Sequence, residues 1–470
     1  MLFHSLQFLL FLPVALAVYW AAAARPLLRK TLLLVSSLIF YMAWNPLPVV
    51  LLLGLTTIDY GVGRALMRVR GAGARKAVLL VSIVSNVGSL ALFKYADWLQ
   101  QLAVDGAALC GVTLVYASLG LMLPVGLSFI VFQGMSYTVD VYRGTLAPRT
   151  RWIDVAVFMT FFPHVVAGPI VRASDFLPQV DVPPALSSAQ GARALFRIAT
   201  GMVKKLVIAD FLSANLIDRV FAEPGNYGGA EVLAAVFAYT LQIYYDFSAY
   251  SDIAIGTAAL FGYALKENFD KPYLSPNLFE FWRRWHMSLG SWLRDYLYIP
   301  LGGNRSSKAR TLVNLLITMV IGGIWHGADG RFALWGLAHG IGLSLTRIWW
   351  WTFGRSKPTR IGTVVCTLIT FLLVMECRIV FRAQNLDHAR VVFFEQWKAT
   401  TAAPNLTPTV LLVLAAATAG HLLTHGFYDR LVRLFTGLPV PLRALWLIGV
   451  ALLIKAVAGV EAQPFIYFKF

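Results

Sequence analysis

Residues 281–305 read FWRRWHMSLGSWLRDYLYIPLGGNR, and residues 321–327 read IGGIWHG. The first segment combines arginines with aromatic residues, and the second places a histidine inside an apolar run. Polar groups are costly at membrane depth, so a histidine in such a run is a candidate functional residue. The sequence therefore indicates a membrane protein organised around residues 279–339.

The composition supports membrane insertion. Of the 470 residues, 58% are hydrophobic and 13% are charged, whereas a soluble domain carries about 25% charged residues. Apolar runs of roughly 20 residues recur along the chain, and each is long enough to cross a bilayer as a helix. These runs are continuous and lack the alternating pattern of a barrel strand. We predict an all-α polytopic membrane protein that forms a single domain over residues 1–470.

The net charge of +17 is distributed over short loops between apolar runs. Cytoplasmic loops of membrane proteins are rich in lysine and arginine, so we expect contacts with membrane lipids and no nucleic-acid partner. The run at residues 6–24 precedes its basic residues, which is the reverse of the charge order in a cleaved signal peptide. We therefore predict an uncleaved first span with the N-terminus outside. The same counting leaves the aromatic tail, residues 464–470, outside the cell.

Prolines, glycines and charges divide the chain into segments. Residues 31–63 are too long for one span and contain Asn-Pro-Leu-Pro, which predicts a hairpin. Residues 94–106 are polar and predict an outer connection. Residues 152–169 predict a re-entrant or tilted helix. Residues 279–301 predict an amphipathic helix along the cytoplasmic face.

One long predicted span, residues 232–262, carries polar side chains that include Tyr245, Asp246 and Asp252. Lipid-facing helices rarely carry such residues. This face therefore lines a cavity or packs on the core of the bundle.

His326 follows two glycines and lies between Trp325 and Gly327. One interpretation is a buried histidine that hydrogen-bonds to a neighbouring helix. The other is a general base, because imidazole titrates near neutral pH.

His286 lies in a strongly basic segment with Arg283, Arg284 and Arg294. These arginines either contact lipid phosphates at the interface or form a cytoplasmic mouth for a phosphorylated donor, since arginine pairs with phosphate bidentately. A metal site is not predicted: His421 and His425 have helical spacing, but no third ligand follows the zinc pattern.

The quoted segments resemble those of the membrane-bound O-acyltransferases, and most closely the bacterial branch that acetylates exported polysaccharides such as alginate. Residues 162–164 (FPH), 167–169 (AGP) and 245–252 (YDFSAYSD) resemble the same branch. Two positions depart from the family pattern. Asp329-Gly330 stands where Asn-Trp is usual, and Lys469 stands where an uncharged residue is usual. These departures put the acceptor or partner contact in doubt.

The resemblance implies a ring of tilted helices with re-entrant segments around a central tunnel. It makes His326 the catalytic histidine and His286 a second active-site residue. The tunnel lining would include Trp325 and Asn304 together with the polar face of residues 232–262. In the tail, Tyr467 is either an interfacial anchor or an acyl relay.

The resemblance also implies the reaction. A cytoplasmic thioester, acetyl-CoA or an acyl carrier, would donate an acetyl group across the bacterial inner membrane, with no bound cofactor. The acceptor would be a hydroxyl of an exported polysaccharide, reached through an extracytoplasmic polysaccharide acetyltransferase or an export complex. Two alternatives stay open: a transporter or flippase with a His/Asp proton relay, and an acyltransferase with a lipid or protein acceptor.

Overall fold

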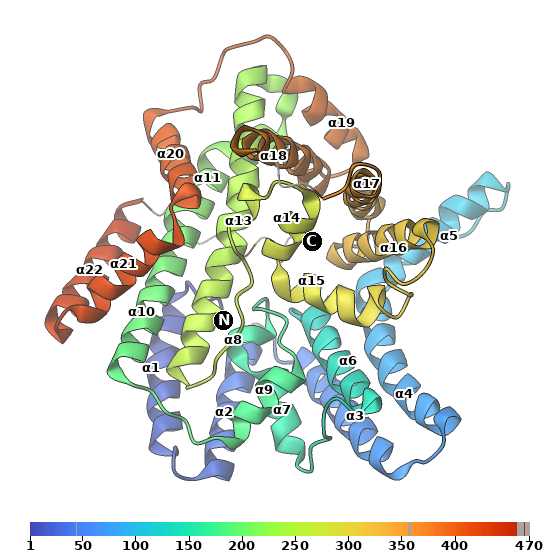
Figure 1. Ribbon diagram of the computed structural model, residues 1–470, viewed down its shortest axis with the longest axis vertical. Helices are drawn as coiled ribbons and strands as arrows, with labels where there is room; N and C mark the ends of the chain where they lie inside the picture. The colour runs from blue at the N-terminus through green and yellow to red at the C-terminus, as the bar shows by residue number, and fades with distance from the viewer. Residues whose placement is uncertain (44, 356–358, 458–464, 466–470) are drawn as a thin grey trace. The chain divides into compact units, whose positions relative to one another are not determined.

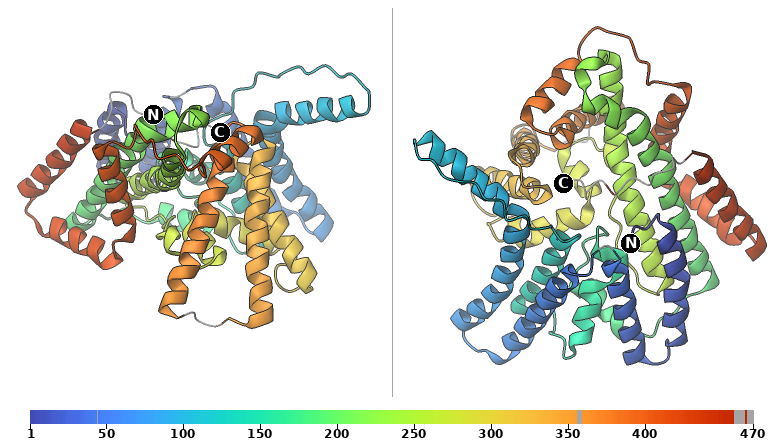
Figure 2. Two further views of the ribbon diagram at one scale, coloured as in Figure 1. Left: turned by 90° about the horizontal axis from the view of Figure 1, so that it is seen from above. Right: turned by 180° about the vertical axis from the view of Figure 1, so that it is seen from behind.

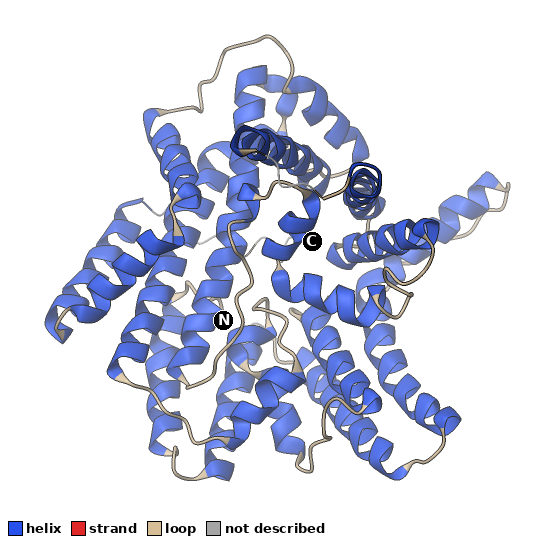
Figure 3. Ribbon diagram, in the orientation of Figure 1, coloured by secondary structure: helices blue, strands red, loops and turns tan. Residues whose placement is uncertain are grey.

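The computed structural model describes residues 1–43, 45–355, 359–457 and 465. In this part of the chain every regular element is a helix (Figure 3), which confirms the all-α prediction. The contacts divide the chain into two compact units. Unit 1 contains residues 1–186, 258–266 and 327–329, and unit 2 contains residues 187–257, 267–326 and 330–470. The single-domain organisation and the central tunnel stay predictions.

The second and third helices of unit 1 form a helical hairpin, as residues 31–63 predicted. Prolines start both of its long helices, because the fixed φ of proline suits the first helical turn. In the connection, Asn45 Oδ1 accepts a hydrogen bond from the amide of Leu47 at 3.0 Å. The helices of this unit are α1 (Leu6–Ala21), α2 (Pro26–Met42), α3 (Pro48–Arg68), α4 (Ala72–Leu90), η1 (Ala91–Tyr95), α5 (Ala96–Leu109), α6 (Leu127–Arg143), α7 (Trp152–Thr160), α8 (Phe162–Val165) and α9 (Ala173–Asp181).

The core of unit 1 combines aromatic packing with a buried ion pair. The ring of Phe40 lies 6.1 Å from that of Phe8 and 5.2 Å from that of Phe162, which joins α1, α2 and α8. Lys30 Nζ of α2 lies 2.6 Å from Asp154 Oδ1 of α7. The predicted re-entrant segment at residues 152–169 is thus a broken, buried helix.

The connection predicted at residues 94–106 is helical, and its place outside the membrane stays a prediction. Residues 72–109 form one continuous helix of 38 residues, because leucine, alanine and glutamine are strong helix formers even where polar residues interrupt them. No residue of α5 is buried, and Figure 2 shows α5 in cyan extending away from α3 and α6. Such a helix is about 57 Å long, which exceeds the bilayer core of about 30 Å.

Unit 2 is built around the first part of the longest helix. Its elements are α10 (Ser188–Met202), η2 (Val203–Ala209), α11 (Asp210–Leu212), η3 (Ser213–Ile217), α12 (Asp218–Ala222), η4 (Pro224–Asn226), α13 (Gly229–Leu260), η5 (Pro272–Leu274), α14 (Leu278–Arg284), α15 (Met287–Leu293), η6 (Arg294–Tyr298), α16 (Lys308–His326), α17 (Gly330–Phe353), α18 (Arg360–Arg382), α19 (Leu386–Glu395), α20 (Pro408–Leu422), α21 (His425–Gly437) and α22 (Val440–Val457). The elements η2, η3 and η6 are π-helical.

Glycines allow α16 and α17 to pack side by side (Figure 1). A Cβ atom on Gly323 would lie 2.2 Å from the carbonyl oxygen of Phe332, and one on Gly336 would lie 2.3 Å from that of Met319. Both positions therefore require glycine, as in close helix pairs of membrane proteins. This contact fixes the end of α16, where His326 lies.

Five helices in the described part are long and apolar enough to cross a membrane, or six if α20 and α21, which meet at a 97° bend, count as one span. This confirms a multi-pass membrane protein. The five are Pro48–Arg68, Ala72–Leu109, Lys308–His326, Arg360–Arg382 and Val440–Val457.

Candidate active site

His286 interrupts the helix predicted over residues 279–301. Its backbone has φ 44° and ψ 54°, a left-handed conformation that costs a non-glycine residue about 1–3 kcal/mol. Two hydrogen bonds to a neighbouring segment impose the break: Met287 N donates to Asn268 O, and Asp270 N donates to Arg284 O, both at 2.9 Å. The prediction of one continuous helix is therefore wrong, because these distant partners replace the hydrogen bonds within the helix.

Asn268 fixes which nitrogen of His286 carries the hydrogen. Its Oδ1 accepts from the backbone N of Ser288 at 3.2 Å and from Ser288 Oγ at 2.8 Å, while its Nδ2 donates to Ser251 Oγ at 3.1 Å. A backbone N–H can only donate, so the Asn268 atom that it contacts is the oxygen. His286 Nδ1 lies 3.2 Å from that same oxygen and must therefore donate. Nε2 is then the basic nitrogen of His286.

Aromatic rings surround the buried His286 side chain. The ring of Phe247 lies 4.6 Å away edge-on, and that of Trp325 lies 6.1 Å away. His286 is 0% exposed, and this burial lowers its pKa to about 3. The imidazole is therefore neutral at physiological pH and can accept a proton at Nε2.

His326 is the last residue of α16 and is also buried. The rings of Trp335 from α17 and Phe381 from α18 each lie 5.2 Å from its ring. Trp325 lies 5.0 Å from His326, so its indole contacts both histidines. The structure thus brings three predicted site residues together: His286, Trp325 and His326.

A third histidine, His339 of α17, was missed by the sequence reasoning. Its ring lies 4.7 Å from Trp335 and 5.3 Å from Trp282, and it is 1% exposed. It lies four residues after Trp335, which is the helical spacing for one face. That spacing is the signal that could have placed it beside His326.

The predicted donor-binding arginines are spread over the surface of α14 and η6. Arg283 pairs with Glu280 at 2.7 Å, and Arg294 pairs with Asp295 at 2.6 Å. Their side chains are 68% and 62% exposed, whereas Arg284 is only half-buried. Asn304 lies in an exposed turn and accepts a hydrogen bond from Tyr298 at 2.6 Å. The roles assigned to these residues stay predictions.

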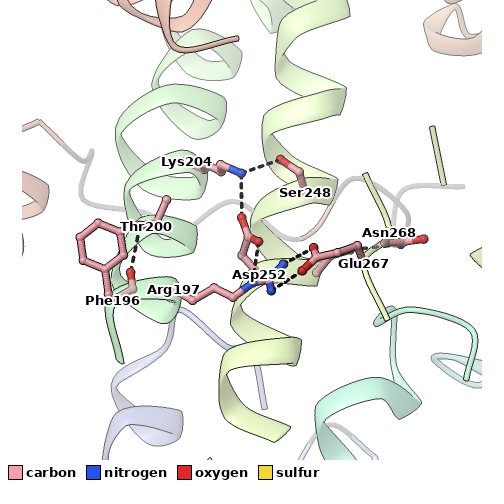
Figure 4. Close-up of polar contacts among 9 residues, drawn as sticks. Phe196, Arg197, Thr200, Lys204, Ser248, Asp252, Glu267 and Asn268 are labelled. Atoms are coloured by element: carbon pink, nitrogen blue, oxygen red, sulfur yellow. Dashed lines mark hydrogen bonds and ion pairs between the residues drawn. The ribbon is translucent and has the colours of Figure 1, made fainter. Parts of the chain in front are cut away.

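The polar face of α13 forms buried ion pairs within unit 2. Asp246 Oδ1 lies 2.8 Å from Lys205 Nζ. Asp252 pairs with Lys204 at 2.7 Å and with Arg197 at 3.0 Å (Figure 4). Tyr245 donates to the carbonyl of Ala417 at 2.6 Å. These contacts fasten α13 to the α10–η2 helix and to α20, and the tunnel-lining role stays a prediction.

The ion pairs also reach the segment that holds His286. Arg197 Nη1 donates to Glu267 Oε1 at 2.6 Å, and a second contact joins Arg197 Nη2 to Glu267 Oε2. Glu267 directly precedes Asn268, as Figure 4 shows. The sequence does not show this role of Arg197 and Lys204, because their partners lie about 50 or more residues away.

Tyr467 lies outside the described residues. Phe465 is described and is 1% exposed. Its ring lies 5.5 Å from that of Phe247 and 4.9 Å from that of Tyr250. Because Phe247 also contacts His286, Phe465 belongs to the same aromatic cluster as this histidine. Within the described residues no group of three or more His, Cys, Asp or Glu side chains could hold a metal ion.

The chain was compared with known proteins. Residues 149–363 match the model of the membrane-bound O-acyltransferase family. The probable alginate O-acetylase AlgI of Pseudomonas aeruginosa is 40% identical over 394 residues, covering 83% of this chain and 73% of that protein. The probable alginate O-acetylase AlgI of Pseudomonas putida is 36% identical over the whole of both chains.

A further relative is named for a different polymer, peptidoglycan. The peptidoglycan O-acetyltransferase of Helicobacter pylori is 34% identical, covering 83% of this chain and 78% of that protein. The two buried histidines beside Trp325 lie inside the segment that matches the family model. The chain therefore belongs to the membrane-bound O-acyltransferase family and is an O-acyltransferase enzyme.

Proposed function

We propose that this enzyme acetylates an exported polysaccharide, taking the acetyl group from a cytoplasmic thioester, acetyl-CoA or an acyl carrier. Relatives named for alginate and for peptidoglycan both act on bacterial glycans, which supports a sugar hydroxyl as acceptor. The observation that carries the proposal is the pair of buried histidines on either side of Trp325. Membership of the family disfavours the transporter alternative.

In the proposed reaction His326 is the general base. It takes the proton of the acceptor hydroxyl while that oxygen attacks the thioester carbonyl carbon. The C–S bond then breaks, and the leaving thiolate takes the proton from His326. General-base assistance of this kind accelerates a reaction about 10²–10⁴-fold. His286, held by Asn268 with Nε2 as its basic nitrogen, is the second polar residue of the site.

The donor would enter from the cytoplasmic face of the inner membrane. Arg283 and Arg294 are the candidates for contact with its phosphates, because their side chains are mostly exposed and each already holds only a surface carboxylate. Arginine at a surface ion pair exchanges partners at little cost. Both chain termini would lie outside the cell, where an extracytoplasmic polysaccharide acetyltransferase is the proposed partner.

Tyr467 is the proposed acyl relay to that partner. Phe465 packs on Phe247, which in turn contacts His286. Tyr467 follows Phe465 by two residues in the sequence. The phenolic oxygen would take the acetyl group from the thioester and pass it to the partner.

The test uses the purified enzyme reconstituted in vesicles with radiolabelled acetyl-CoA. We expect label on the wild-type protein, none with His326→Ala or Tyr467→Phe, and normal labelling with the exposed-tyrosine control Tyr116→Phe. Labelling that persists in His326→Ala would overturn the assignment of the base. Donor turnover that needs His326 but not Tyr467 would reject the relay and indicate direct transfer. Label in lipid or in another protein would identify a different acceptor.

A further inference from the structure

Asp59 is a buried carboxylate in unit 1, remote in sequence from the residues assigned to the reaction. It lies near the middle of α3, which is one of the candidate membrane spans, and it is 0% exposed. Ser82 Oγ of α4 lies 2.6 Å from its Oδ1. Asn86 Nδ2, also of α4, lies 3.0 Å from Oδ1 and 3.2 Å from Oδ2. A carboxylate at this depth calls for a functional explanation.

The groups that face Asp59 carry no compensating positive charge. Thr138 of α6 is linked to Asp59 through the hydroxyl of Ser82. The hydroxyl of Tyr137, also of α6, packs against α3 at Gly63. Asp154, the charged residue of α7, pairs with Lys30 of α2 at 2.6 Å. Within the described residues no Lys, Arg or His forms an ion pair with Asp59. Burying an ionised carboxylate without a positive partner is strongly unfavourable.

A second observation concerns two oxygens that meet at Gly134 of α6. A Cβ atom on Gly134 would lie 2.1 Å from Asp59 Oδ2 and 3.1 Å from Asn86 Oδ1. Both oxygens therefore face the same point. Asn86 Oδ1 is buried and has no hydrogen-bond partner in the described structure. Two acceptor oxygens that face one point repel each other unless one of them carries a hydrogen.

We propose that Asp59 is a proton-binding site, occupied at neutral pH, in the middle of the α3–α4–α6 bundle. The bound species is a proton on Asp59 Oδ2, the oxygen that faces Gly134, which removes the charge and the repulsion with Asn86 Oδ1. This site is independent of the proposed acyl transfer.

A chain of hydroxyls leads away from the carboxyl group. Ser82 Oγ lies 2.8 Å from Thr138 Oγ1, and Thr138 Oγ1 donates to the carbonyl oxygen of Gly134 at 3.2 Å. With the proton on Oδ2, Ser82 donates to Oδ1 of Asp59 and Thr138 donates to the carbonyl oxygen of Gly134. Both hydroxyls keep an acceptor whether or not Oδ2 carries the proton, so protonation changes only the O–H bond at Oδ2.

Infrared difference spectroscopy of the purified full-length protein tests the proposal. At neutral pH the wild type should show the C=O band of a protonated carboxyl group that Asp59→Asn lacks. The matched control is Asp154→Asn, which removes the buried carboxylate paired with Lys30 and should leave the band unchanged. A band identical in wild type and Asp59→Asn would overturn the proposal. So would a band that disappears when sodium is added, which would assign the site to a metal cation.

Thermal unfolding provides the second measurement. The folded state holds a proton that the unfolded chain loses above about pH 4, so the stability of the wild type should fall as the pH rises. Asp59→Asn keeps the shape and neutrality of the protonated acid and should lose this part of the pH dependence. Failure of Asp59→Asn to fold, or an unchanged pH dependence, would contradict the proposal, because either result would mean that the native group is charged.

Discussion

The two histidines beside Trp325 are positioned in different ways. His286 sits in a left-handed turn and is oriented by a hydrogen bond to Asn268 at 3.2 Å. His326 ends a regular helix and is enclosed by the rings of Trp335 and Phe381. The hydrogen bond to Asn268 selects the tautomer of His286, and the two rings hold the position of the His326 imidazole. The His286 region should therefore be sensitive to small polar changes, and the His326 region to loss of the imidazole itself.

The largest effect is expected from replacing the imidazole of His326, one of the two histidines that pack against Trp335. His326→Phe preserves an aromatic ring in the pocket but removes the base, so the acetyl-transfer rate should fall about 10²–10⁴-fold. His339→Phe makes the same exchange on the other side of Trp335 and should keep most of the activity. Initial rates of labelled acetyl transfer, with thermal unfolding as the control for folding, measure both. Equal losses in the two variants would show that packing, and not base chemistry, matters at His326.

A smaller loss is expected at Asn268, which positions His286 without being assigned to the chemistry. Asn268→Ala removes the acceptor that fixes Nδ1–H, and displacement of a reacting group can cost up to about 10²-fold. Asn268→Asp should restore part of the rate, because a carboxylate also accepts from Nδ1. It should also shift the acidic limb of the pH–rate profile upward, since a negative charge favours imidazolium. A merely structural Asn268 would give two variants with the same unshifted profile.

The sequence located most of the His326 region and little of the His286 region. Gly323, Trp325 and His326 follow one another in a single helix, so local pattern and function coincide. The left-handed turn at His286 depends on Asn268, 18 residues earlier, and a single sequence does not show such a pairing. The same reason hid the environment of Asp59, whose partners Ser82 and Asn86 lie 23 and 27 residues away.

Residues 94–106 show a different limit of the sequence pattern. Their polar character predicts a connection between spans but does not show whether the backbone of that connection is helical. The polarity of a segment indicates whether it lies inside the membrane, whereas its helix propensity indicates its backbone conformation. Residues 94–106 are rich in helix formers. Gln101 Nε2 even donates to Asp105 Oδ1 at 2.8 Å with the four-residue helical spacing, a pair that supports a helix.

The ion pairs of Arg197 with Asp252 and with Glu267, the residue before Asn268, are expected to contribute to the stability of the His286 region. Asp252→Asn leaves Arg197 and Lys204 with one fewer anion at a site where the aspartate side chain is 15% exposed. We expect a loss of about 1–3 kcal/mol, the cost of unsatisfied buried polar groups. Glu267→Gln removes the other partner of Arg197, whose side chain is 58% exposed, and should cost less than about 1 kcal/mol. Denaturation midpoints rank the two, and the reverse order would mean that the exposed contact to Glu267 supports the turn.

The smallest expected effect is on how the stability of the folded protein depends on acidic pH. It tests whether the His286 ring is neutral in the folded protein. Because burial lowers the pKa of His286 to about 3, the folded protein keeps this ring neutral while the unfolded chain protonates it below about pH 6.5. Stability from this group is therefore complete above that pH and falls as the pH drops further. His286→Asn, which tolerates a left-handed backbone, should lose stability less steeply between about pH 6 and pH 5. An unchanged slope would mean that His286 is protonated in the folded enzyme, and that its interaction with Asn268 does not leave Nε2 as a base.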